Sequence, residues 1–178
     1  MFKFASAALS AAFLLAAPAT AAVIDVPVAT GFYLETEGVG DFLIDGADAV
    51  ADGYEQSLLA DLSVVFDVAS PLTTATGSFT LRGDEGELLY GDLSGVSFFD
   101  DIVTLSFGNL TGAAAAAFGP LLSVEMFFFD GFTLPVDGGS YEVSLFAQGG
   151  ATPAPVPLPS GIVLLGSGLA ALALRRRR

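Results

Sequence analysis

The strongest constraint on the fold is the alternation of apolar and polar residues in several separate stretches of the chain. A period of two residues is typical of strands with one face buried and one exposed, and it is incompatible with the 3.6-residue period of a helix. The pattern therefore predicts half-buried antiparallel strands. Its apolar members are Leu62, Val64, Phe66 and Val68, then Phe79 and Leu81, then Val103, Leu105 and Phe107, and finally Tyr141, Val143, Leu145 and Ala147.

Turn signals rich in glycine, proline and aspartate separate these stretches at intervals of roughly ten residues. They include Ser70-Pro71, the segment 82–86, Asp130-Gly131 and the segment 137–139. Short strands at such intervals are typical of an antiparallel β-sandwich or jelly roll. We therefore expect residues 22–150 to form a single all-β domain.

Two stretches depart from the alternation. Residues 45–59 are acidic and compatible with either a loop or a single helix. Residues 111–118 contain the alanine run 113–117, and we expect a short helix that Thr111 caps and Gly119-Pro120 ends.

The segment 121–132 is the most apolar part of the domain, and its phenylalanines at 127–129 would occupy both faces of a strand. A continuous apolar run favours a central strand covered on both sides. The other interpretation is an edge that associates with a second copy, with Glu125 and Asp130 acting against aggregation.

The charge of the chain is acidic and unevenly distributed. All 20 acidic residues lie between the two ends of the chain, where Arg82 is the lone basic residue. A nucleic-acid partner is excluded, because phosphate binding needs clustered Lys and Arg. Solvated carboxylates that keep a β-rich secreted protein soluble account for most of this acidity.

The chain has no Cys, no His and no Trp. The commonest general base and the thiolate nucleophile are therefore missing, and we do not expect an enzyme. A glycoside hydrolase working through paired carboxylates stays open as an alternative. Its candidates are numerous and none is marked out: Glu35 with Glu37, Asp84, Glu85 and Glu87, and Asp100 with Asp101.

Calcium is the one cofactor that the sequence makes a candidate, and no other cofactor is expected. Asp45, Asp48, Asp52 and Glu55 place four carboxylates in one segment, and calcium prefers several oxygen ligands from flexible acidic loops. The segment does not match an EF-hand loop, because the spacing differs and Ala47 stands at the third position. Solvated acidic loops are the alternative.

Residues 1–21 have the three parts of a signal peptide: Lys3, a short apolar segment, and a small-residue cleavage site. Ala19 and Ala21 form that site, so that signal peptidase would leave Ala22 as the new N-terminus after passage through the translocon. A retained N-terminal anchor is the alternative.

The C-terminal end also has three parts. A proline-rich linker covers 151–160, an uncharged segment covers 161–174, and Arg175, Arg176, Arg177 and Arg178 close the chain. At ~1.5 Å per residue the uncharged segment would form a helix roughly 21 Å long, short of a ~30 Å hydrocarbon core. We expect a marginal transmembrane helix whose arginines stay in the cytoplasm.

The order of these parts resembles the VPLPA-CTERM sorting signal, a relative of the PEP-CTERM signals of Gram-negative bacteria. The motif residues are Val156, Pro157, Leu158, Pro159 and Ser160, with Ser160 where the family has Ala. The resemblance covers residues 156–178. It implies processing near the motif by an exosortase-type membrane protease, after transient or retained anchoring in the inner membrane.

Together these features predict an exported protein delivered to the cell surface or extracellular matrix, in a non-catalytic structural or adhesive role. A matrix polysaccharide is a partner that such a role allows. A calcium- or carbohydrate-binding module and the carboxylate-based glycoside hydrolase are the alternatives.

Overall fold

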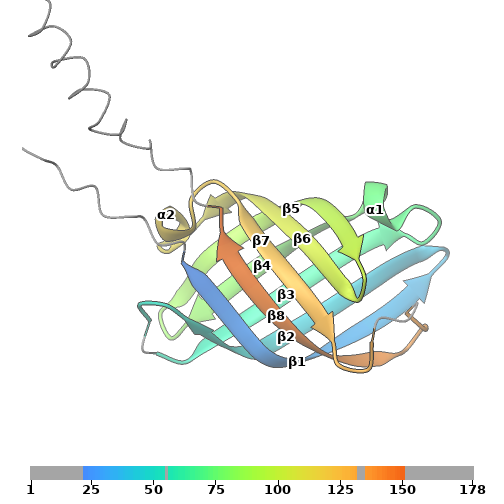
Figure 1. Cartoon of the computed structure of the whole chain (residues 1–178), viewed down its shortest axis with the longest axis horizontal. Coiled ribbons are helices and arrows are strands. Elements are labelled where there is room, and N and C mark those ends of the chain that lie inside the picture. The colour runs from blue at the N-terminus through green and yellow to red at the C-terminus, as the bar shows by residue number, and fades with distance from the viewer. Residues whose placement is uncertain (1–21, 55, 132–134, 151–178) are drawn as a thin grey trace, which may run out of the picture.

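A computed structural model describes residues 22–54, 56–131 and 135–150. Within these residues, eight antiparallel strands form one closed barrel in which each strand pairs with its neighbours in sequence and β1 pairs with β8 (Figure 1). The elements are β1 (Val23–Thr36), β2 (Val39–Ala51), β3 (Leu58–Asp67), α1 (Pro71–Thr74), β4 (Thr76–Gly83), β5 (Gly86–Phe99), β6 (Ile102–Thr111), α2 (Ala115–Phe118), β7 (Leu122–Phe128) and β8 (Ser140–Gly149).

The all-β antiparallel prediction is confirmed, whereas the expected sandwich or jelly roll is replaced by a barrel. The alternating stretches form strands β3, β4, β6 and β8 with their apolar members inside the barrel, except that Val68 lies just beyond β3 and is exposed. A two-residue period is the same on a sandwich and on a barrel. Closure depends on the distant pairing of β1 with β8, in which Val23 lies opposite Gln148.

Strand β2 corrects the expectation of a loop or helix over residues 45–59. The strand runs to Ala51 and pairs with β3, with Asp48 opposite Leu59. A β-bulge between Ile44 and Ala47 shifts the pairing, so that the inward residues are Phe42 and Ile44 before it and Ala49 and Ala51 after it. The shift breaks the alternation and hides the strand from pattern analysis.

Strand β1 contains a second bulge, between Val26 and Ala29, where Pro27 interrupts the pairing with β8. Proline has no N–H to donate, so it is tolerated at a bulge within a sheet. The turn from β1 to β2 has positive φ at Glu37 (54°) and Gly38 (81°), the geometry of the two-residue turns that match strand twist.

The segment 121–132 also differs from the expectation. Strand β7 turns Leu122, Val124 and Met126 into the core while Phe127 faces outwards, half-buried, and Phe132 lies outside the described residues. Both edges of β7 are paired, with β6 and with β8, so it is neither covered by a second layer among the described residues nor a free edge.

The barrel has two different ends (Figure 1). At one end, α2 packs into the interior through Phe118, and Ala114 just before the helix is buried there too; both residues are 1% exposed. Ala114, rather than Thr111, precedes this helix, and no side chain caps it. We call this the closed end. Ala22 and Gly150 lie here as well, since Gly149 donates to Ala22 O and Gly150 to Leu121 O.

The other end, which we call the mouth, is formed by the β1–β2 and β5–β6 hairpins, α1 with its flanking loops, and the β7–β8 loop. The core fills the closed half with large side chains, among them Phe79 and Phe107, whose ring centroids are 5.8 Å apart. The interior beneath the mouth contains open space instead.

Candidate functional site

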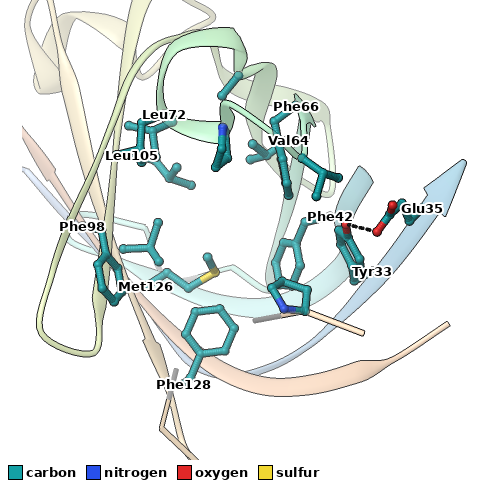
Figure 2. Close-up of a pocket in the computed structure, with 16 residues that line it drawn as sticks. Tyr33, Glu35, Phe42, Val64, Phe66, Leu72, Phe98, Leu105, Met126 and Phe128 are labelled. Carbon is teal, nitrogen blue, oxygen red and sulfur yellow. Dashed lines mark hydrogen bonds between the residues drawn. The ribbon is translucent and has the colours of Figure 1, made fainter. Parts of the chain in front are cut away.

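A cavity of about 420 Å³ opens at the mouth of the barrel. Figure 2 shows side chains from several strands surrounding it. Its wall is almost entirely apolar and includes Phe42, Val64, Phe66, Leu105, Met126 and Phe128. Ligand sites of 300–1,000 Å³ are typical for small molecules, and the mouth of a β-barrel is a common place for them.

The wall follows from the strand register. On β5 and β6, Val96 lies opposite Leu105 and Phe98 opposite Val103. Val103 in turn lies opposite Met126 on β7. Because alternate residues of a strand share one face, these pairs all point into the barrel and form a continuous apolar surface.

Two aromatic rings of the cavity wall, Phe42 and Phe128, pack against each other and against Tyr141 behind them. The centroid of Phe42 lies 6.2 Å from that of Phe128 and 6.5 Å from that of Tyr141, and Phe128 and Tyr141 meet edge to face at 6.1 Å. These distances lie in the favourable range for aromatic pairs, so the rings are held in place by one another.

The β7–β8 loop is fastened to β1 beside the cavity. Tyr33 N donates to Gly139 O at 2.9 Å, and Gly138 N donates to Tyr33 O at 3.0 Å. The Tyr141 hydroxyl accepts a hydrogen bond from Val136 N at 2.6 Å, and Asp137 Oδ1 accepts one from Glu35 N at 2.8 Å. These bonds fix the described part of the loop at the rim.

Tyr33 and Glu35 are the polar residues of the cavity wall among the described residues. The Tyr33 hydroxyl donates to Glu35 Oε2 at 3.3 Å, as Figure 2 shows. Burial and then the negative charge of Glu35 raise the pKa of Tyr33 above its ordinary value of 10.0. The Tyr33 hydroxyl is therefore protonated at neutral pH, and its proton lies in the hydrogen bond to the Glu35 carboxylate.

The mouth of the barrel is acidic. The exposed carboxylates of its loops and strand ends belong to Glu35, Glu37, Asp67, Asp100, Asp101, Asp130 and Asp137. In the described part of the chain the lone basic side chain is that of Arg82, one residue before the end of β4 and near the closed end of the barrel. Arg82 binds Asp61 through Nε (2.6 Å) and Nη2 (2.7 Å). No positive side chain of these residues offsets the field at the mouth.

The carboxylates that are candidates for a hydrolase lie in three separate places in the fold. Glu35 lies on β1 at the cavity, whereas Glu37 lies in the following turn. Asp100 lies in the β5–β6 turn together with Asp101, at the mouth. Asp84, Glu85 and Glu87 lie at the β4–β5 hairpin near the closed end.

The proposed calcium ligands are spread along a strand and a turn. Asp45 and Asp48 lie on β2, Asp52 follows that strand, and Glu55 lies outside the described residues. Asp45 approaches Arg82 at 3.8 Å. Residues 22–54, 56–131 and 135–150 contain no group of three or more acidic side chains placed to hold a metal ion. Calcium binding stays a prediction.

The described residues do not include the predicted sorting motif 156–160, the uncharged segment 161–174, the terminal arginines 175–178, or Ala19 and Ala21 of the predicted cleavage site. Ala22 is described and precedes β1. Both helices of the described part have four residues, and neither meets the length and apolar character that a membrane span requires.

The sequence alone does not mark Tyr33, Phe42, Met126 and Phe128 as residues of a cavity. Their apolar character is that of any core position, so the sequence carries no signal that the space beside them is open. The fold and the cavity together define a closed antiparallel barrel with an apolar interior chamber open at one end. Comparisons with protein-family models, with curated proteins and with solved structures returned no match.

Proposed function

We propose that this protein is an exported, non-catalytic binding protein that carries a small apolar molecule in its barrel. The observation that carries the proposal is the cavity of about 420 Å³ with apolar walls and one polar pair at its rim. At about 30 Å³ per water molecule, it has room for roughly fourteen groups of that size. Transfer of an apolar molecule from water to such a wall is favourable in proportion to the area buried.

The contacts within the cavity wall support a binding role rather than a purely structural or adhesive one. The aromatic cluster and the bonds that fasten the β7–β8 loop hold the cavity open before a ligand arrives. A preformed site avoids much of the entropic cost of ordering side chains on binding. A purely structural or adhesive role would not require such a space.

The two ends of the sequence support export and delivery to the cell surface or extracellular matrix. A carbohydrate ligand is less well supported than an apolar one, because sugars need many hydrogen-bonding partners and the described wall offers Tyr33 and Glu35 alone. A glycoside hydrolase is also less well supported, because it needs two carboxylates and the described wall offers Glu35 alone.

The binding proposal is tested with N-phenyl-1-naphthylamine, a neutral dye whose fluorescence rises in apolar surroundings. We expect saturable binding of one dye per protein. Val103→Trp places a large ring inside the cavity and should abolish binding. Thr104→Trp places the same ring on the outer face of β6 and should leave binding intact. Equal binding by both variants would contradict the proposal.

The sorting part is tested by intact-mass spectrometry of the protein from its native host, separated into medium, surface and membrane fractions. We expect an N-terminus at Ala22 and loss of the arginine tail near 156–160, outside the membrane fraction. A full-length C-terminus confined to the membrane would contradict the sorting route but not the binding proposal.

A further inference from the structure

The cavity has its polar groups on one side of the mouth. Tyr33 and Glu35 provide them, and the remaining described wall is hydrocarbon apart from the thioether of Met126. The Tyr33 hydroxyl donates a hydrogen bond to Glu35 Oε2. Glu35 Oε1 has no hydrogen-bond donor among the described residues. The site can therefore accept a hydrogen bond from a ligand more readily than it can donate one.

The same side of the mouth presents aromatic faces. Tyr33 stacks on Phe66 with centroids 6.0 Å apart and ring planes 20° apart. Both residues line the cavity, as does Glu35. A cation beside a ring face is attracted by the negative face of the ring, and more strongly where water is excluded. An adjacent carboxylate adds a charge-assisted hydrogen bond.

The wider charge distribution has the same sign. The β1–β2 and β5–β6 hairpins and the β7–β8 loop at the mouth carry exposed carboxylates, and Asp67 adds one at the end of β3. Arg82 lies near the other end in contact with Asp61. Such a field raises the local concentration of cations and repels anions before they reach the opening. An amphiphile with a carboxylate or phosphate head is thus opposed by the mouth, although its chain would suit the cavity.

We infer that the ligand is an amphiphile with a positively charged amine head, seated with the amine between Glu35 and the Tyr33–Phe66 stack and the apolar chain in the barrel. The inference rests on the proposed function and adds the chemistry of the head. It assigns Glu35, which is exposed at the rim, as the residue that selects this head.

The test uses three ligands with the same chain and different heads: dodecylammonium, dodecanol and dodecanoate, each below its micelle concentration. Each displaces bound N-phenyl-1-naphthylamine from the full chain. We expect dodecylammonium to bind more tightly than dodecanol by roughly tenfold, the factor of a charge-assisted hydrogen bond, and dodecanoate to bind most weakly.

Glu35→Gln removes the charge and keeps the shape, and it should bring dodecylammonium close to dodecanol, with both affinities expressed relative to that of the neutral dye for the same variant. Glu37→Gln is the matched control, because it removes the same charge from the adjacent turn, outside the cavity wall. It should keep most of the amine preference.

Two results would overturn the inference: dodecanoate binding as tightly as dodecylammonium, or equal effects of the two Gln variants. Both leave the proposed function standing as long as the neutral dye binds. Failure of the wild-type protein to bind the dye or any of the three ligands would remove the proposed function itself.

Discussion

The rings of Tyr33 and Phe66 stack across Gly40, which lies opposite both Glu35 on β1 and Phe66 on β3. A Cβ on Gly40 would lie 2.7 Å from the Tyr33 hydroxyl oxygen and 2.8 Å from Phe66 Cε2. Contacts this short do not occur between relaxed side chains, so the stack exists because residue 40 has no side chain.

Gly40→Ala should therefore push the two rings apart and into the cavity. We expect a loss of stability of about 1–3 kcal/mol, as for other overpacked cores, and weaker binding of the neutral dye. Denaturant unfolding followed by circular dichroism gives the first quantity and dye titration the second.

Gly95→Ala is the control for this substitution. The nearest atom to a Cβ at Gly95 is 3.9 Å away, which is ordinary van der Waals contact. Equal effects of the two alanine variants would show that loss of a glycine, rather than the ring contact, is responsible.

Tyr33→Phe should flatten the dependence of stability on alkaline pH. The pKa of Tyr33 is raised in the folded state, so between about pH 10 and that higher value the unfolded chain has released a proton that the folded chain keeps. Its contribution is complete below pH 10 and is lost as pH rises through the folded pKa. Unfolding free energies from pH 9 to 12 measure the slope.

The hydrogen bond to Asp92, and then the charge of that residue, also raise the pKa of Tyr90. The double variant with Tyr33→Phe and Tyr90→Phe should accordingly show a flatter curve than either single variant. An unchanged slope in Tyr33→Phe would mean that the hydroxyl is not held as the structure indicates.

Phe118→Ala should be among the most destabilising single changes. The ring is 1% exposed and fills the closed end of the barrel, and removal of a buried phenylalanine costs about 3–5 kcal/mol. Phe99→Ala is the comparison, since that ring is 76% exposed at the β5–β6 hairpin and should change stability by no more than about 0.5 kcal/mol. Chemical denaturation of both variants would decide the matter.

Asp61→Asn should lower the unfolding temperature more than Asp45→Asn. Asp61 accepts from Arg82 and from Gly46 N (2.8 Å), whereas Asp45 is largely exposed and meets Arg82 at 3.8 Å. Thermal unfolding at low and high salt tests this expectation. The Asn variant keeps a neutral oxygen that can accept from Gly46 N, so its loss comes mainly from the ion pair with Arg82. High salt should shrink the difference, and a difference that salt leaves unchanged would contradict the role of that ion pair.

The strands that alternate without interruption could be predicted from the sequence, because burial of one face leaves a direct record in residue type. Phe79 and Leu81 on β4 are examples. Strands β1 and β2 could not be predicted, because the bulges beside Pro27 and Gly46 shift the alternation of inward and outward residues by one position in the middle of each strand. Ala47, Asp48 and Ala49 suit a helix, and pairing with β3 overrides that preference.

The cavity could not be predicted for a different reason. Leu105 and Leu122 are both apolar inward residues, yet one lines open space and the other lies in the filled half. The difference depends on how far α2 reaches into the barrel and on the absence of a matching plug at the mouth among the described residues. Neither is encoded in the pattern of any single strand. Glu35, in contrast, was among the candidate carboxylates, although in a hydrolytic role and paired with Glu37.

Both Ala22 and Gly150 lie at the α2 end, and the mouth lies at the opposite end. Gly150 directly precedes the segment that contains the predicted sorting motif. A protein tethered through that segment would have its closed end towards the attachment point and its mouth directed away from it. Under the proposed function, cargo could then enter and leave from the surroundings without release of the carrier from the surface.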